Sequence, residues 1–240
     1  MKVIGIIPAR LAATRLPDKP LLDIAGKSMI RRVWEQSRKA GSLSEVYVAT
    51  PDESIAAAVA AFGGIPIMTS PDHRSGTDRL AEAAANLDAE IVVNIQGDEP
   101  LIDPEMIERA VQPLLDEPDL QMSSLMCPCP TTELESPATV KVVCDLYGNA
   151  LYFSRHRIPF PRTEHAATVM QHIGLYVYRR EFLLKFASLP PTPLEKTESL
   201  EQLRVLENGY KIRMVEVAEA PLSVDTQEDL ERVRLVLPGQ

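Results

Sequence analysis

The fold is decided by residues 2–20, KVIGIIPARLAATRLPDKP. The first part, residues 2–7, is a short apolar run without a helix start signal, which predicts a buried strand of a parallel sheet. The rest of the stretch carries three cations and three prolines, and each proline restricts its own backbone and that of the preceding residue. A rigid cationic loop is therefore expected at the carboxyl end of a buried strand, where open α/β sheets bind their ligands.

The cations of this loop are Arg10, Arg15 and Lys19. Arginine can hold phosphate oxygens in pairs, and lysine acts as a point charge, so together they suit a polyphosphate. The alternative is a solvated surface loop with scattered bases, and this stretch by itself favours neither interpretation.

The composition describes an acidic globular chain of 240 residues, 45% hydrophobic and 25% charged, with a net charge of -9 and a pI near 5.0. This length accommodates one large α/β domain, with or without a small lobe. The acidity argues against a nucleic-acid partner. The sequence shows no apolar run of ~18 residues and no signal peptide, so we expect no membrane association and a cytoplasmic location.

The chain has three cysteines, Cys127, Cys129 and Cys144. Their spacing matches neither a C-x-x-C pair nor a four-ligand zinc site. Reduced, partly buried thiols are therefore expected.

Strand and helix patterns alternate along the first half of the chain. We expect strands over residues 45–50, 65–68, 89–95 and 121–126, and helices from Ser28 and over residues 52–62, 78–87 and 104–115. Short links between such elements predict an α/β fold with a doubly wound, mostly parallel, Rossmann-like sheet.

The pattern changes after Val140, where residues 140–145 and 150–154 flank a turn and predict an antiparallel hairpin. The second half is therefore expected to add a smaller mixed-sheet lobe. Its further expected elements are strands over residues 171–179 and 211–217 and helices over residues 180–188, 195–208 and 227–236. We expect a single domain, 1–240, with one part over about 1–126, the lobe over about 139–225, and the helix 227–236 packing back.

Two segments after the cationic loop carry candidate ligand-binding groups. Ser75, Gly76 and Thr77 suit a helix N-terminus, where free N–H groups accept an anion or a base edge, although a plain capping segment is the alternative. Asp98 follows the strand 89–95 and Gly97, which permits a close backbone approach. A carboxylate that faces a polyphosphate-binding loop is a natural Mg²⁺ ligand, and a turn aspartate is the alternative.

The loop resembles the signature loop of the sugar cytidylyltransferases, and it is most similar to that of the CMP-Kdo synthetase (3-deoxy-manno-octulosonate cytidylyltransferase) family. The segments that carry the resemblance are Ile7-Pro8-Ala9-Arg10, Thr14-Arg15-Leu16-Pro17, Lys19-Pro20-Leu21, Ser75-Gly76-Thr77-x-Arg79, Gln96-Gly97-Asp98-Glu99-Pro100, Ala150-Leu151-Tyr152-Phe153-Ser154-Arg155, His172-x-Gly174-x-Tyr176, Leu200-Glu201-Gln202-Leu203-Arg204 and Val224-Asp225-Thr226. They stand in the family's order along essentially the whole chain.

The resemblance implies a nucleotide-diphospho-sugar transferase type of fold and a nucleotidyltransferase activity. The implied reaction transfers CMP from CTP to 3-deoxy-D-manno-octulosonate (Kdo), giving CMP-Kdo and pyrophosphate for lipopolysaccharide biosynthesis. It further implies Mg²⁺ as cofactor, a homodimer, a nucleotide-binding first part, and a lobe for sugar binding and dimerisation. Rival hypotheses are another acidic sugar, such as a sialic acid or 8-amino-Kdo, a glycosyltransferase, and a catalytically inactive nucleotide-binding regulator.

The resemblance also assigns roles to residues. Lys19, Asp98 and Asp225 would be catalytic, with Asp98 and Asp225 as the metal ligands. The nucleotide would be bound by Pro8, Ala9, Arg10, Arg15, Lys19, Thr50, Asp52, Ser75, Gly76, Thr77, Arg79, Gln96 and Gly97. The sugar would be bound by Tyr152, Arg155, His172, Tyr176, Glu201 and Gln202, with Arg155 on the substrate carboxylate. The plain alternatives are that Asp225 only caps a helix, Arg155 is a surface arginine, His172 is structural, and Glu201 and Gln202 are solvated.

Overall fold

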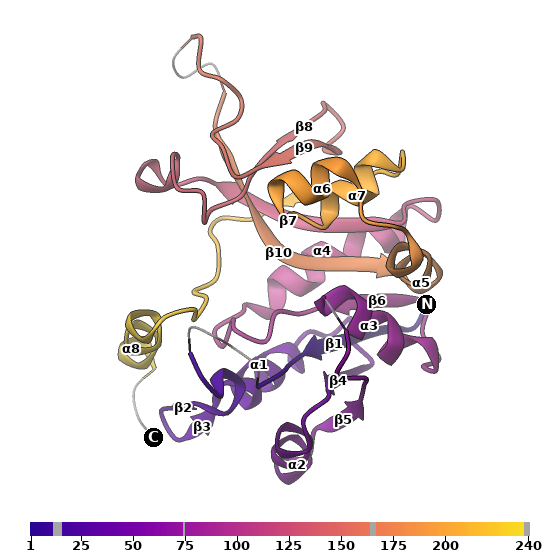
Figure 1. Ribbon diagram of the computed structural model, residues 1–240, viewed down its shortest axis with the longest axis vertical. Helices are drawn as coiled ribbons and strands as arrows, with labels where there is room; N and C mark the ends of the chain where they lie inside the picture. Colours follow the sequence, from indigo (N-terminus) through magenta and orange to yellow (C-terminus); the bar gives the residue numbers. More distant parts are fainter. Residues whose placement is uncertain (12–15, 74, 164–166, 238–240) are drawn as a thin grey trace. The chain divides into compact units, whose positions relative to one another are not determined.

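A computed structural model describes residues 1–11, 16–73, 75–163 and 167–237 (Figure 1). The chain forms two compact units: unit 1 comprises Met1–Glu108 and Pro221–Gln240, and unit 2 comprises Arg109–Ala220. The sequence pattern grouped residues 109–126 with the first part of the chain. In the structure they belong to unit 2, because the strand that begins within them, at Met122, pairs with strands of that unit.

The sheet of unit 1 is parallel. Its strands are β1 (Val3–Pro8), β4 (Glu45–Thr50), β5 (Ile65–Met68) and β6 (Ile91–Asn94). They lie in the order β5-β4-β1-β6, because β1 pairs with both β4 and β6, and β4 pairs with β5. The predicted doubly wound parallel sheet is confirmed. The strand order reverses between β1 and β6, and such a reversal leaves a crevice beyond the carboxyl ends of the two strands.

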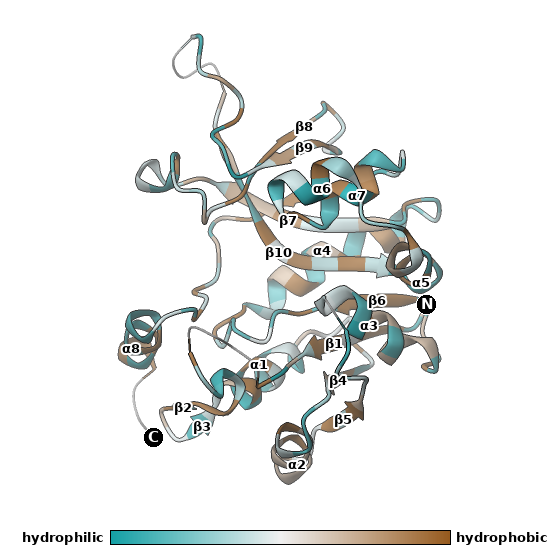
Figure 2. Cartoon of the chain, in the orientation of Figure 1, coloured by the Kyte–Doolittle hydropathy of each residue, from teal (hydrophilic) through white to brown (hydrophobic). Residues whose placement is uncertain are grey.

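Three helices connect these strands: α1 (Met29–Ser37), α2 (Glu53–Ala61) and α3 (Gly76–Ala85). Each buries an apolar side, and α3 contacts β1, β4 and β6. Figure 2 shows brown, hydrophobic strands β1 and β6, whereas α3 mixes hydrophobic and hydrophilic residues. Burial of one apolar stripe fixes each helix on the sheet.

The cationic loop leads into a short segment that a C-terminal helix covers. This segment holds a 3-10 turn η1 (Lys19–Leu21) and a small antiparallel pair, β2 (Asp23–Ile24) with β3 (Lys27–Ser28). The helix α8 (Gln227–Val236) contacts β2. Leu230 and Val233 of α8 pack in one buried cluster with Leu16, Ile24 and Met29. Helix α8 is thereby fixed beside Leu16 and β2.

Unit 2 has a mixed sheet. Its strands are β7 (Met122–Pro128), β8 (Lys141–Cys144), β9 (Ala150–Ser154), β10 (Met170–Arg179) and β11 (Arg213–Glu216). β10 runs antiparallel to β7 and β8, β8 and β9 form the predicted hairpin, and β11 is parallel to β7. The mixed-sheet lobe is thus confirmed. This unit also contains most of α4 (Pro104–Asp116), the 3-10 turn η2 (Thr131–Glu133) and α5 (Arg180–Ser188).

The helix expected over residues 195–208 is wrong, because the chain forms two helices there, α6 (Pro193–Glu198) and α7 (Gln202–Glu207). Ser199 adopts the left-handed conformation at φ 54° and ends α6, a position that glycine more often takes. Leu200 then turns inward and is buried. No glycine or proline marks this break in the sequence, so the helical periodicity predicted one continuous helix.

Within the described ranges no helix is long and apolar enough to cross a membrane.

Candidate active site

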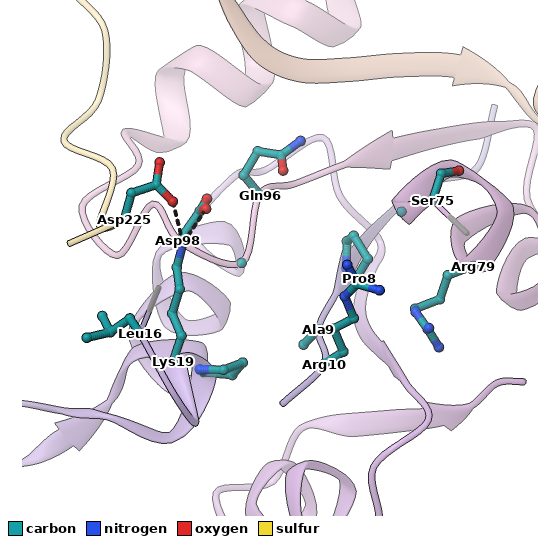
Figure 3. A pocket seen from close by; sticks show the side chains of 13 residues that line it. Pro8, Ala9, Arg10, Leu16, Lys19, Ser75, Arg79, Gln96, Asp98 and Asp225 are labelled. Carbon is teal, nitrogen blue, oxygen red and sulfur yellow. Dashed lines mark hydrogen bonds and ion pairs between the residues drawn. The ribbon is translucent and has the colours of Figure 1, made fainter. Parts of the chain in front are cut away.

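A cavity of about 450 Å³ opens in unit 1 beyond the carboxyl ends of β1 and β6 (Figure 3). Its volume lies in the range of small-molecule sites. The lining residues come from the segment after β1, the start of α3, the segment after β6 and the approach to α8. They are Pro8, Ala9, Arg10, Leu16, Lys19, Pro20, Ser75, Gly76, Arg79, Gln96, Gly97, Asp98 and Asp225.

The start of the loop after β1 is held by the neighbouring strand. The Ala9 N–H donates to the carbonyl of Ala49 at 2.9 Å. The Leu11 N–H donates to Asp52 Oδ2 at 2.8 Å, and the Asp52 N–H donates in turn to Thr50 Oγ1 at 3.1 Å. Asp52, itself held by Thr50, therefore fixes the backbone at Leu11. This contact helps to place the neighbouring Arg10 at the cavity.

The segment after β6 comes close to the same loop. A Cβ built on Gly97 would lie 3.1 Å from the Pro8 carbonyl oxygen. That distance is tight for any side chain, so glycine allows the two segments to meet. The expectation that Gly97 permits a close backbone approach is confirmed, and Asp98 follows directly at the cavity.

The N-terminus of α3 forms a third wall. Ser75 is the N-cap residue, and its hydroxyl accepts a hydrogen bond from the Asp78 N–H at 3.2 Å. The helix therefore begins at Gly76, two positions before the expected start, because the Ser75 cap already satisfies a free N–H of the first turn.

Arg79 and Arg10 bring two guanidinium groups to one side of the cavity (Figure 3). Arg79 is buried and donates to the hydroxyl of Thr69 and, at 3.1 Å, to the carbonyl of Ser70. Burial, and next the charge of Arg10, lower the pKa of Arg79. Two like charges that disfavour each other would be stabilised by an anion between them.

Lys19 lies between two carboxylates on the other side of the cavity (Figure 3). Its Nζ donates to Asp98 Oδ2 at 2.8 Å and to Asp225 Oδ1 at 2.9 Å. The side chain of Lys19 is 15% exposed, whereas that of Asp225 is 54% exposed. Burial by itself would lower the pKa of Lys19, but the two carboxylates outweigh it and raise that pKa, so the ammonium stays charged.

Asp225 reaches this cluster through its neighbour in the chain. The Val224 N–H donates to the carbonyl of Asp98 at 2.9 Å, and the Val224 side chain is buried in the cluster beneath α8. The N-cap of α8 is Thr226, which exchanges hydrogen bonds with Asp229 in a capping box. The alternative that Asp225 only caps this helix is therefore wrong, and its carboxylate faces Lys19 instead.

The pair Asp98 and Asp225 has the chemistry of a site for Mg²⁺ bound with phosphates. Both carboxylates already share one cation, the Lys19 ammonium. Among the described residues no group of three or more His, Cys, Asp or Glu could hold a metal by itself. Mg²⁺ commonly takes one or two protein carboxylates and completes its shell with phosphate oxygens and water, so the donor set fits.

Glu99 is a residue to which the sequence analysis gave no role. It is buried, and its Oε2 has no hydrogen-bond partner among the described residues. Burial, and next the charge of Asp98, raise the pKa of Glu99 to about 8. The sequence signal that could have pointed to Glu99 is a second carboxylate directly after Asp98. Glu99 is not among the described residues that line the cavity, whereas Leu16 and Pro20 do line it and had no signal of their own beyond membership of the loop.

The structure brings most of the predicted nucleotide-binding residues to this one cavity. Those that line it are Pro8, Ala9, Arg10, Lys19, Ser75, Gly76, Arg79, Gln96 and Gly97. Thr50, Asp52 and Thr77 are not among the described residues that line it, and Thr50 is fully buried. Arg15 lies outside the described residues.

The predicted sugar-binding residues all belong to unit 2, where His172 and Tyr176 on β10 form an aromatic pair with ring centroids 5.3 Å apart. The His172 Nε2 lies 2.9 Å from Ser124 Oγ, and burial lowers the pKa of His172 to about 3, so the imidazole is neutral at pH 7. Burial, and next the charge of Glu201, raise the pKa of Tyr176. The negative charge of Glu201 therefore acts on the Tyr176 hydroxyl and disfavours its ionisation.

Arg155 is not a free surface arginine. Its guanidinium donates from Nε to the carbonyl of Glu198 at 2.8 Å, from Nη1 to that of Pro137 at 2.9 Å and from Nη2 to that of Ser199 at 3.3 Å. Three of its five N–H groups are thereby engaged, and the other two have no acceptor among the described residues, so they can serve a ligand. Gln202 is buried, and Glu201 Oε1 lies 3.8 Å from Arg204 Nη2, so the alternative that these two are merely solvated is wrong for Gln202.

Comparison with known proteins places this geometry among cytidylyltransferases. A family model described as "Cytidylyltransferase" matches residues 4–212. The 3-deoxy-manno-octulosonate cytidylyltransferase of Syntrophotalea carbinolica is 51% identical, and the match covers 100% of this chain and 100% of the relative. That of Geobacter sulfurreducens is 53% identical, with 97% of this chain and 98% of the relative covered.

Solved structures agree with these relatives. The structure of CMP:2-keto-3-deoxy-manno-octonic acid synthetase complexed with CTP is 46% identical, covers 98% of both chains and superposes with a TM-score of 0.96. A cytidylyltransferase from Leptospira borgpetersenii, 18% identical with a TM-score of 0.67, shares the fold.

Proposed function

The chain belongs to the 3-deoxy-manno-octulosonate cytidylyltransferase family, and we propose that it carries out that family's reaction. It transfers CMP from CTP to Kdo and releases pyrophosphate, which makes it a nucleotidyltransferase that supplies CMP-Kdo for lipopolysaccharide biosynthesis. The fold class, the sequence relatives and the CTP complex of a 46% identical protein support this assignment.

The observation that carries the proposal is the position of Lys19. Its ammonium lies between Asp98 and Asp225, at a cavity beyond the point where the strand order reverses. Cations and carboxylates of this kind are what a nucleoside triphosphate and its counter-ion require at such a crevice. The guanidinium groups of Arg10 and Arg79 add positive charge to the same cavity.

In the proposed mechanism the chain binds CTP, orients it and neutralises charge. The anomeric hydroxyl of the sugar attacks the α-phosphorus, the bond from that phosphorus to the bridging oxygen breaks, and pyrophosphate leaves in line. Lys19 and Arg10 stabilise the negative charge that grows on pyrophosphate. Mg²⁺ held by Asp98 and Asp225 would neutralise phosphate charge and lower the pKa of the attacking hydroxyl. The reaction needs no protein nucleophile.

The sugar acid is assigned to residues of unit 2. Tyr152, Arg155, His172 and Tyr176 would contact it together with two residues at the α6–α7 junction, Glu201 and Gln202. The two N–H groups of Arg155 that bind no acceptor in the described part of the chain suit the sugar carboxylate. His172 is neutral, so it can donate a hydrogen bond from one nitrogen and accept one at the other.

A homodimer and a cytoplasmic location complete the proposal. Leu146, Tyr147, Leu151 and Phe160 are large hydrophobic residues that unit 2 exposes on or just after the β8–β9 hairpin. Large exposed apolar side chains favour a protein interface, and we assign a second copy of the chain to this part of unit 2. The cysteines Cys127, Cys129 and Cys144 are free thiols, as a reducing compartment favours. Sedimentation of wild type and Phe160→Ser would test the dimer.

The function is tested by pyrophosphate release from CTP and Kdo in the presence of Mg²⁺. We expect release with Kdo, and none when Kdo or Mg²⁺ is left out. 8-Amino-Kdo and a sialic acid, supplied in parallel at equal concentration, show which acidic sugar is used. Release with either analogue but not with Kdo would overturn the substrate assignment.

Asp98→Asn is the matched control for the assay, because it keeps the shape of the side chain and removes one carboxylate from the cluster around Lys19. We expect it to fold and to release no pyrophosphate. A variant as active as the wild type would show that the cavity does not carry the reaction.

A further inference from the structure

The carboxylate of Glu198, at the last residue of α6, binds the end of β9. Its Oε1 accepts hydrogen bonds from Ser154 Oγ at 2.7 Å and from the Tyr152 hydroxyl at 3.4 Å. Its Oε2 accepts from the Arg155 N–H at 3.0 Å. One side chain thus contacts three of the four residues 152–155, including two that are assigned to the sugar.

Arg155 returns the contact to the same turn. Its guanidinium donates to the carbonyls of Glu198 and Ser199, at 2.8 and 3.3 Å. These carbonyls end α6, where Ser199 is left-handed at φ 54°. The Glu198 side chain thus binds the Arg155 backbone, and the Arg155 side chain binds the backbone of Glu198 and Ser199. These reciprocal contacts fix the break between α6 and α7 against β9.

This break decides where two further sugar candidates lie. Glu201 and Gln202 follow Ser199 directly and begin α7. In an uninterrupted helix they would be displaced relative to β9, because each residue of a helix turns by about 100°. The contact between Glu198 and Arg155 therefore sets the position of the β9 candidates and of the α7 candidates relative to each other.

The backbone of Arg155 has a second anchor that does not involve Glu198. Lys141 is fully buried, and its ammonium donates to the carbonyls of Ser136 at 2.6 Å, Thr139 at 2.8 Å and Arg155 at 3.2 Å. The hairpin is therefore held without the Glu198 carboxylate. Loss of that carboxylate should loosen the position of α6 and α7 while the sheet of unit 2 stays folded.

We propose that Glu198 is a positioning residue for the sugar acid: it does not contact the substrate, but holds Tyr152 and Arg155 in register with Glu201 and Gln202. The inference rests on the proposed function, which assigns those four residues to Kdo. It also gives Tyr152 a defined role, because a hydroxyl that donates to Glu198 presents its oxygen to the sugar as an acceptor.

The charge state of Glu198 supports this arrangement. Burial by itself would raise the pKa of Glu198, but the Arg155 N–H, the Ser154 hydroxyl and the Tyr152 hydroxyl outweigh it and hold that pKa below its usual value. The carboxylate is therefore ionised at neutral pH, and it accepts all three hydrogen bonds.

The test compares Glu198→Ala and Glu198→Gln with Glu207→Gln. Glu207 is a matched control, because it also binds α6, at the N–H groups of Leu194 and Glu195, but makes its contacts at the other end of that helix. For each protein we would measure kcat, the KM for Kdo and the KM for CTP, the affinity for Kdo by calorimetry without CTP, and the melting temperature.

We expect Glu198→Ala to raise the KM and the dissociation constant for Kdo about tenfold, because a half-buried hydrogen-bond set loses its acceptor. The KM for CTP should change by less than about twofold. Glu198→Gln should recover part of the Kdo affinity, since the amide oxygen still accepts. Glu207→Gln should leave both KM values at the wild-type level, even where its melting temperature falls.

Folded Glu198→Ala with wild-type affinity for Kdo, or with equal losses for Kdo and CTP, would overturn the positioning role. If Glu198→Ala does not fold, Glu198→Gln decides by the same criterion. A wild-type protein that releases no pyrophosphate from CTP and Kdo would instead overturn the proposed function and the role of Glu198 with it, so the two failures are distinguishable.

Discussion

The carboxylates of Asp98 and Asp225 accept hydrogen bonds from the same ammonium group, that of Lys19, at 2.8 and 2.9 Å. The two aspartates are 225 − 98 = 127 positions apart in the sequence. A backbone hydrogen bond from the Val224 N–H to the Asp98 carbonyl joins the two segments that carry these aspartates. A cation is thus held where the proposed Mg²⁺ would bind.

Asp225→Asn should give a folded protein without activity. Asparagine keeps the shape of the side chain, and Thr226 with Asp229 caps α8 without Asp225. The charge that Mg²⁺ prefers is lost. We expect the melting temperature to stay within about 2 °C of the wild type, and kcat to fall below about a tenth, a loss of more than ~1.4 kcal/mol in transition-state stabilisation.

Circular dichroism and the Mg²⁺ dependence of pyrophosphate release measure both effects. A variant that retains more than about a tenth of the wild-type kcat would show that the metal ligand lies elsewhere.

Lys19→Met should bind a divalent cation more tightly when no nucleotide is present. The ammonium of Lys19 competes for the same two carboxylates, so its removal frees them. We expect an increase of about tenfold in Mn²⁺ affinity, measured by electron paramagnetic resonance. The kcat should nevertheless fall, because the cation also stabilises the departing pyrophosphate.

Lys27→Met is the control for this experiment, since Lys27 forms an ion pair with Glu35 at 2.7 Å and does not line the cavity among the described residues. It should leave Mn²⁺ affinity unchanged. Equal Mn²⁺ affinities of the wild type and Lys19→Met would contradict the competition.

Arg10→Ala should weaken CTP binding without loss of stability. Arg10 is exposed at the cavity, whereas Arg79 is buried and bonded to Thr69 and Ser70. Loss of one charged hydrogen-bond partner weakens binding by about 2 kcal/mol, or roughly thirtyfold. Arg79→Ala should also lower the melting temperature. Calorimetry with CTP at two salt concentrations measures the effect, and an unchanged affinity of Arg10→Ala would place the triphosphate elsewhere.

His172→Gln should reduce the acid sensitivity of the fold. The pKa of His172 is about 3 in the folded chain against 6.5 as the ordinary value. The unfolded chain therefore binds the extra proton first, and stability falls as the pH drops below 6.5. Each pH unit below 6.5 lowers the free energy of unfolding by at most about 1.4 kcal/mol through this group. We expect a loss of about 1 kcal/mol, because His172 keeps some accessible surface.

Urea unfolding at pH 7.5 and pH 5.5 checks this prediction. The free energy of unfolding should fall by about 1 kcal/mol more for the wild type than for His172→Gln. Equal losses would show that His172 is not neutral in the folded chain.

Hydrophobic pattern and turn residues sufficed for the elements that form locally. The strand at Val3–Pro8, the strand Glu45–Thr50 and the helix Gln227–Val236 follow from periodicity and from caps that lie next to them in the sequence. The break at Ser199 did not follow, since it is held by Arg155, which comes from a distant segment and donates to the carbonyls of Glu198 and Ser199. A left-handed serine leaves no signal in the pattern of its neighbours.

The sequence by itself determined the parallel sheet, the cationic loop and the kinds of group that can hold a triphosphate, because each depends on residues that are close together along the chain. The tertiary structure alone decided that Lys19 lies between Asp98 and Asp225 and that Arg155 binds the turn after Glu198. Those relationships join segments far apart in the sequence, and their geometry is fixed by strand order and packing, which no local pattern encodes.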